Sequence, residues 1–187
     1  MRRPHEPRYG VSLLTDHDVY LFKEGNHFDL HDKLGSHPMT VDGEPGTLFS
    51  VWAPNASAVS VVGDFNEWDA VAHPLAVRHD SSGIWEGFLP GLGRGALYKY
   101  HIVSGQGDYR GDKGDPFARF WETSPKTASI VTDLDSYTWN DDDWMEKRRQ
   151  TEPLTQPVSI YELHLGSWMH ESSANPALRP DGTPEPV

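Results

Sequence analysis

The feature that most limits the fold of this chain is a series of short segments with a two-residue period between residues 46 and 134. In "ALYKYHIV", Tyr98, Tyr100 and Ile102 fall on one side of a strand, and Lys99 and His101 fall on the other. "TLFSVWA", "AVSVVG", "GIWEGFL" and "TASIVTDL" are further expected strands, and Gly, Pro, Asn and Asp fill the turns between them. Strands and turns of this kind predict an immunoglobulin-like β-sandwich of about 100 residues. We place it at residues 36–137.

Short helices are expected on both sides of the predicted sandwich. In "TDHDVYLFKEG", Thr15 can cap a helix whose third residue is Asp18, and Val19 and Phe22 would face inward. A second short helix is expected in "NHFDLHDKLG", so residues 1–35 form a leader with short helices. After the sandwich, "WNDDDWMEKRRQ" has acidic residues at its start, basic residues at its end and Asn140 as a possible cap, which predicts a helix. That helix and a linker occupy residues 138–157.

The segment "VSIYELHLGSW" differs from the sandwich strands because it is apolar almost throughout. Such a run is typical of a strand that is buried on both faces, as in parallel sheets. A parallel strand needs neighbours, and no second segment of this type follows. Residues 158–187 are therefore predicted to be the start of a further domain that is truncated in this sequence.

Charge and composition exclude several classes of function. The net charge is −12, with 16 basic and 28 acidic residues, which argues against nucleic acid and anionic membranes as partners. No window reaches the roughly 18 apolar residues that a membrane helix requires. The chain has no cysteine, so disulfides and thiolate metal sites are excluded, and a cytoplasmic location is expected. These properties suit a neutral ligand.

Candidate catalytic and metal-binding residues are poorly supported by the sequence. His27 and His31 are four residues apart but lack an evident third ligand. Asp64, Glu67 and Asp69 lie on one turn, whereas glycosidase carboxylates must face each other across a cleft. We therefore expect no catalytic residue, no metal and no cofactor in this chain.

The turn "VVGDFNEWD" raises a different possibility, because it places Trp68 among polar residues. A flat aromatic face with hydrogen-bonding groups at its edge matches the C–H face and the hydroxyls of a sugar ring. Asn66 beside the tryptophan and Lys99 on the outward face of a strand can complete such a surface. The alternative is that Trp68 covers the open end of the sandwich and that Lys99 is only solvated.

Six segments, taken in chain order, resemble the N-terminal part of bacterial 1,4-α-glucan (glycogen) branching enzymes. They are "LLTDHDVYLFKEGNHFDLHDKLGSHP", "FSVWAPNASAVSVVGDFNEWD", "GIWEGFLPG", "GALYKYHI", "DPFARFWETSPKTASIV" and "SIYELHLGSW". The resemblance implies that the sandwich is a carbohydrate-binding module of the isoamylase N-terminal type, followed by an α-amylase-type (β/α)8 barrel. "VSIYELHL" would be the first barrel strand. The catalytic carboxylates would come from later strands, beyond Val187, so this chain alone is expected to be inactive.

The resemblance also implies a binding site. In related glycan-binding modules the sugar stacks between two tryptophans, and a lysine and a polar loop complete the site. Trp68 matches the first tryptophan and Lys99 the lysine, whereas Tyr109 is the nearest substitute for the second tryptophan. Thr127 lies in the last loop, "SPKTAS". The predicted glycan-binding residues are thus Trp68, Lys99, Asn66, Tyr109 and Thr127.

The function implied by the resemblance is that of a fragment of an enzyme of glycogen biosynthesis, which transfers α-1,4-glucan segments to form α-1,6 branches. Its partners would be α-1,4-glucan or glycogen and its own catalytic barrel. Two other functions stay open: a stand-alone, non-catalytic glycan-binding or scaffold domain, and a general immunoglobulin-like interaction domain. "SIYELHLGSW" favours the enzyme fragment, because a free-standing module has no use for a barrel strand.

Overall fold

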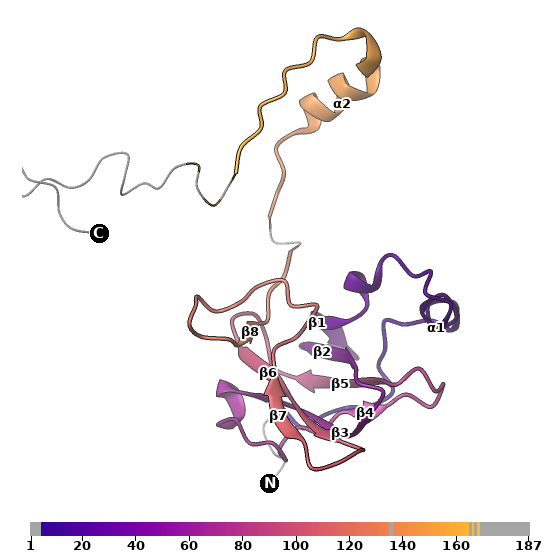
Figure 1. The fold of residues 1–187 in the computed structure, drawn as a ribbon, viewed down its shortest axis with the longest axis vertical. Coiled ribbons are helices and arrows are strands. Elements are labelled where there is room, and N and C mark those ends of the chain that lie inside the picture. Colours follow the sequence, from indigo (N-terminus) through magenta and orange to yellow (C-terminus); the bar gives the residue numbers. More distant parts are fainter. Residues whose placement is uncertain (1–4, 135–136, 165, 167, 169–187) are drawn as a thin grey trace, which may run out of the picture. The chain divides into compact units, whose positions relative to one another are not determined.

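The computed structural model describes residues 5–134, 137–164, 166 and 168 (Figure 1). The chain divides into two units, Met1–Tyr137 and Thr138–Val187. The first unit is mainly β and holds two antiparallel sheets, which confirms the predicted fold class of the sandwich. One sheet has the strand order β1 (Gly35–Val41), β2 (Glu44–Trp52), β5 (Ile84–Pro90) and β4 (Ala76–Val77). The other consists of β3 (Ala56–Gly63), β6 (Leu97–Ser104) and β7 (Arg110–Lys113), and β8 (Ser129–Ile130) also pairs with β6.

The core lies between the inward faces of the two sheets. Phe49 of β2 and Tyr98 of β6 are fully buried, and their rings meet edge to face with centroids 5.0 Å apart. Tyr100 is also fully buried, and Ile102 packs partly buried against the same core cluster, as the two-residue period of "ALYKYHIV" predicts. Aromatic contacts between the sheets therefore fix which face of β6 points outward.

The N-terminal segment forms a second, smaller core. Helix α1 (Asp16–Lys23) has the predicted capping box, since the Thr15 side chain accepts from the Asp18 N–H and the Asp18 carboxylate accepts from the Thr15 N–H. Val19 of this helix packs with Leu14, Leu34 and Ile84. The helix expected in "NHFDLHDKLG" is reduced to one 3-10 turn, η1 (Leu30–Asp32).

Three strands were not predicted from the sequence. β1 contains Pro38, which lowers the strand propensity of "GSHPMTV". Proline is tolerated there because β1 lies at the edge of its sheet. β4 and β7 are too short, at two and four residues, to show a period of two.

The second unit contains the predicted helix, α2 (Asp142–Gln150), and a 3-10 turn, η3 (Pro153–Thr155). The predicted cap, Asn140, is wrong: Asp141 occupies the N-cap position, one residue later, and its side chain makes no capping hydrogen bond. Residues 157–164 pair with no strand of the part described, so the predicted barrel strand stays a prediction. Most of the remaining predicted barrel segment, residues 165, 167 and 169–187, lies outside the described residues. No helix of the described part is long and apolar enough to cross a membrane.

Candidate functional site

Trp68 is held on a tight turn that follows β3. The strand ends at Gly63, and the 3-10 turn η2 (Asp64–Asn66) comes next. Glu67 and Trp68 both have positive φ angles, 56° and 61°, which non-glycine residues adopt only when surrounding contacts hold them. The Trp68 N–H donates to the Gly63 carbonyl over 2.9 Å. With this backbone, Trp68 is 40% exposed.

Asn66 stabilises this turn from within. Its side-chain oxygen accepts the Gly63 N–H over 2.9 Å, and its amide nitrogen lies 3.0 Å from the Val61 carbonyl and 2.8 Å from His73 Nδ1. Both amide N–H donors therefore have partners inside the protein. In this structure Asn66 is a positioning residue that holds the backbone before Trp68.

Lys99 links Trp68 to the loop before β8. It lies opposite Val62 of β3, and its side chain leaves the sheet on the face away from Tyr98 and Tyr100. Lys99 Nζ lies 6.0 Å from the centroid of the Trp68 ring, a distance at which a cation is attracted to an aromatic face. Lys99 Nζ also donates to the Thr127 hydroxyl over 2.8 Å. Three of the five predicted residues, Trp68, Lys99 and Thr127, are thus brought together.

Tyr109 does not join this group. Its ring packs over Gly111, where an added Cβ would lie only 2.7 Å from the Tyr109 hydroxyl oxygen. Lys113 Nζ lies 5.2 Å from the same ring. Gly111 pairs with Ile102, whose side chain packs against the core. The register therefore places Tyr109 at the face of the sheet opposite to that of Lys99.

The structure adds one aromatic residue that sequence reasoning missed, Trp121. A Cβ added at Gly114 would lie 2.3 Å from Cζ3 of Trp121 and 3.5 Å from the Thr127 carbonyl oxygen. Trp121 therefore lies beside Thr127, and it is 43% exposed. The segment "DPFARFW" contains this tryptophan, but its place next to Thr127 depends on how the loop turns back, which no periodicity in the sequence reports.

A buried carboxylate anchors the start of that loop. Asp115 accepts hydrogen bonds from the hydroxyls of Tyr98 and Tyr100 over 2.6 Å and 3.2 Å. Its other oxygen accepts the Phe117 N–H over 2.8 Å. Burial raises the pKa of Asp115 above its usual value, against the opposite effect of these hydrogen bonds. Asp115 therefore connects the loop to the core and makes no contact with the exposed surface.

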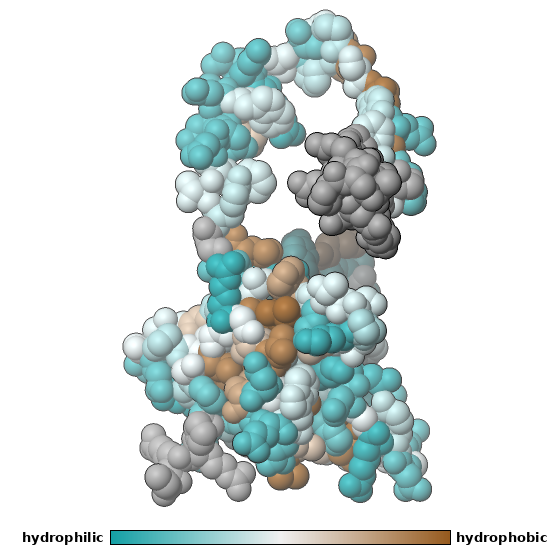
Figure 2. Space-filling model, turned by 90° about the vertical axis from the view of Figure 1, so that its left-hand side faces the viewer, coloured by the Kyte–Doolittle hydropathy of each residue, from teal (hydrophilic) through white to brown (hydrophobic). Residues whose placement is uncertain are grey.

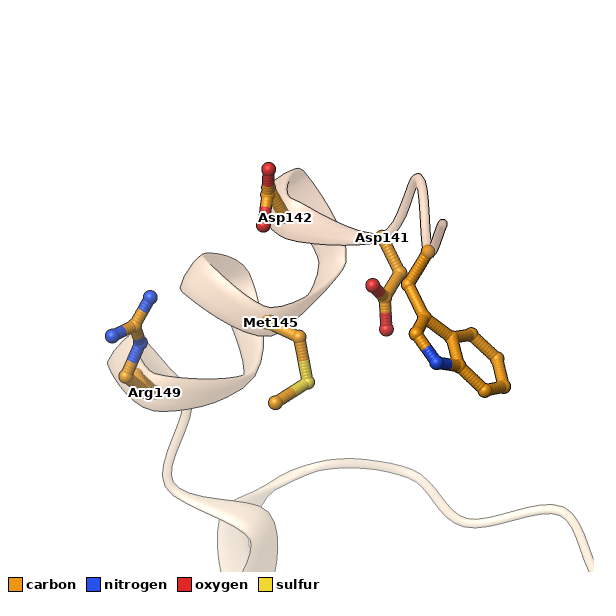
Figure 3. Close-up of a pocket in the computed structure, with 5 residues that line it drawn as sticks. Asp141, Asp142, Met145 and Arg149 are labelled. Atoms are coloured by element: carbon orange, nitrogen blue, oxygen red, sulfur yellow. The ribbon is translucent and has the colours of Figure 1, made fainter. Parts of the chain in front are cut away.

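The surface of each unit carries further apolar side chains. The side of the first unit on which β8 lies has hydrophobic side chains gathered between hydrophilic ones (Figure 2). In the second unit, a hollow on α2 is lined by Asp142, Met145 and Arg149 together with Trp139 and Asp141 (Figure 3). None of the predicted sugar-binding residues lies there. No group of three or more metal-ligating side chains occurs among the residues with described positions.

Comparison with known proteins finds a family match within the first unit. The family model of carbohydrate-binding module 48 (isoamylase N-terminal domain) matches residues 33–118. The 1,4-alpha-glucan branching enzyme GlgB of Thermosynechococcus vestitus is 56% identical over 175 residues, which are 93% of this chain and 22% of that protein. The enzyme of the same name from Trichodesmium erythraeum is 51% identical over 184 residues, 98% of this chain and 23% of that protein. The chain thus spans less than a quarter of the length of these relatives.

Among solved structures, apo pullulanase from Klebsiella pneumoniae is similar with a TM-score of 0.47 and 24% identity. The match covers 61% of this chain and 12% of the pullulanase.

Proposed function

We propose that this chain binds α-1,4-glucan. Residues 33–118 match carbohydrate-binding module 48, and the chain corresponds to the N-terminal part of 1,4-α-glucan branching enzymes. The observation that carries the proposal is the contact series from Trp68 through Lys99 to Thr127. An exposed indole face, an ammonium and a hydroxyl lie side by side, and this combination suits a sugar ring with apolar faces and polar edges.

The chemistry of each group supports a neutral glucan. The Trp68 ring offers a flat face to sugar C–H groups. Lys99 carries three N–H donors, and Thr127 accepts only one of them, so further donors can meet sugar hydroxyls. The net charge of −12 would repel a polyanion, whereas an uncharged glucan meets no such barrier.

In the branching reaction, this part is proposed to hold and position the glucan. The chemistry of branching, in which a glucan segment is transferred, would then rest on carboxylates of a barrel domain. Residues 158–164 are proposed as the first strand of that barrel. A cytoplasmic location would place the protein with its glycogen substrate.

A purely structural module is the competing function. The observation that favours it is that Trp68 is only 40% exposed, so more than half of its surface is already covered by the protein. The two functions differ in whether Trp68 is needed for glucan to bind.

Affinity electrophoresis through a gel containing glycogen separates these functions. We expect glycogen to retard the wild-type chain and the retardation to be lost in Trp68→Ala. Trp144→Ala is the matched control, because Trp144 is a 59% exposed tryptophan on α2. Retardation that persists in Trp68→Ala, or a wild type that migrates freely, would argue for the structural function.

A further inference from the structure

We infer that Trp121 is a second sugar-stacking residue of the Trp68 site, and that the site takes an extended α-1,4-glucan chain. This inference rests on the proposed function. It goes beyond the family match, which ends at residue 118 and so leaves out both Trp121 and Thr127.

The first step of the argument is proximity. Gly114 has no side chain, and the six-membered ring of Trp121 occupies the place where a Cβ would stand. The Thr127 carbonyl borders the same place. The Thr127 hydroxyl accepts from Lys99, and Lys99 Nζ lies over the Trp68 ring. Each residue thus neighbours the next in the order Trp68, Lys99, Thr127, Trp121, and we call these four residues the row.

The second step is presentation. Trp121 lies on a segment that is paired at both sides, by the bond from Ile130 N–H to the Phe120 carbonyl and by the bond from Glu122 N–H to the Ala128 carbonyl. These bonds fix the backbone, while 43% of the tryptophan remains exposed. An aromatic ring that is held in place before binding loses little entropy when a ligand stacks on it.

The third step concerns the rival residue. Tyr109 is as exposed as Trp121, so exposure alone does not separate the two residues. The strand register places it at the opposite face of the sheet from Lys99. The second aromatic surface of the site is therefore assigned to Trp121.

The row implies a ligand longer than one sugar. A single glucose unit covers one ring, whereas a chain can lie over both rings and place hydroxyls against Lys99 and Thr127 between them. Binding at two linked points strengthens affinity through effective concentration. The site should therefore favour long maltooligosaccharides over maltose, and Trp121 should carry this preference.

The test is isothermal titration of maltose and of maltoheptaose into wild type, Trp121→Ala, Trp121→Leu and Tyr109→Ala. For maltoheptaose, losing one aromatic contact should weaken binding about fivefold to tenfold. For maltose, the same variants should change little. Trp121→Leu keeps an apolar contact with Gly114 but lacks a flat face, so it should lose the preference for maltoheptaose over maltose. This variant keeps the test decisive even if Trp121→Ala does not fold. Tyr109→Ala should behave as wild type.

Trp68→Ala is titrated alongside as the variant that lacks the first aromatic surface. The inference is overturned if Trp121→Leu binds maltoheptaose as tightly as wild type does while Trp68→Ala binds it weakly. That result would leave the proposed function intact. The inference is also overturned if Tyr109→Ala, and not the Trp121 variants, loses the preference for the longer chain. A wild type that binds neither sugar would instead remove the proposed function itself.

Discussion

At the scale of single residues, the display of Trp68 depends on how the turn around it is held. The positive φ angles at Glu67 and Trp68 are unfavourable for residues with a Cβ, and the Asn66 amide helps to hold the turn through three contacts. The display of Trp68 is therefore a property of the whole turn "GDFNEW".

Asn66→Ala tests this dependence. Removing the amide leaves partly buried backbone groups without partners and should lower the free energy of unfolding by about 1–3 kcal/mol. Glycogen retardation should weaken as well, because Trp68 loses its fixed backbone. Urea unfolding followed by fluorescence gives the first quantity, and Asn55→Ala, on an exposed turn, is the control. An Asn66→Ala protein as stable as wild type would show that the turn keeps its conformation without the Asn66 side chain.

Asp115 gives a pH dependence with a definite sign. Burial raises its pKa in the folded state above the ordinary value of about 3.9. A raised pKa means that the stabilising contribution is complete below the ordinary value and is lost as pH rises through the folded-state pKa. The stability of wild type relative to Asp115→Asn should therefore fall from pH 4 upward. Urea unfolding of both proteins at several pH values measures this difference, and a difference that grows with pH would contradict the assignment.

At the scale of elements, the capping box of α1 attaches the N-terminal segment to the sandwich. Hydrogen bonds from Thr15 are the largest cause of a lowered pKa at Asp18, and His27 and Lys33 add to it. A lowered pKa gives stability that is complete above the ordinary value of about 3.9, declines below it, and is lost as pH falls through the lower folded-state pKa.

Thr15→Ala should cost about 1 kcal/mol of unfolding free energy at neutral pH, since the helix loses its cap. The cost should shrink at low pH, because the stabilisation that the ionised Asp18 provides declines once the pH falls below about 3.9. Thermal unfolding at pH 7 and pH 3 provides the comparison, with Thr123→Ala on an exposed loop as the control. If Thr15→Ala lost the same unfolding free energy at both pH values, the contribution of the Thr15 cap would not depend on the charge of Asp18.

The sequence predicts those elements whose signal is local. The alternation in "ALYKYHIV" and the capping box around Thr15 each appear in the structure. β1 is not predicted because it contains Pro38, which a strand accepts only at the edge of a sheet. Which strand lies at the edge depends on the order of all strands in the sheet, and the local sequence does not give that order. The meeting of Trp68, Lys99 and Thr127 is expected from the resemblance, whereas the contact of Trp121 with Gly114 is not, because the turning back of its loop has no local pattern. The face of the sheet at which Tyr109 lies follows from the register between β6 and β7, and the local sequence does not predict that register either.

At the scale of the whole molecule, the second unit exposes apolar side chains that a self-contained domain would bury. Val158, Ile160 and Tyr161 are 74%, 89% and 70% exposed. Such exposure is expected of a strand whose neighbours come from elsewhere, as proposed for a barrel strand.

Hydrogen exchange compares this chain with a longer protein that includes a barrel. Amides from Val158 to Leu163 should exchange quickly in the 187-residue chain, because they have no strand partner among the described residues. They should become protected in the longer protein. Slow exchange in the 187-residue chain would show that the segment has found partners without a barrel and would remove the proposal for it.

The most direct measurement of glucan binding observes the indole N–H signals of the seven tryptophans by two-dimensional NMR during titration with maltoheptaose. We expect the signals of Trp68 and Trp121 to shift together and saturably, while those of Trp139 and Trp144 in the second unit stay in place. Trp52 and Trp85, whose indoles donate to backbone carbonyls, should also stay in place. Shifts confined to the second unit, or no shift of any indole at saturating sugar, would contradict a glucan site on the row from Trp68 to Trp121.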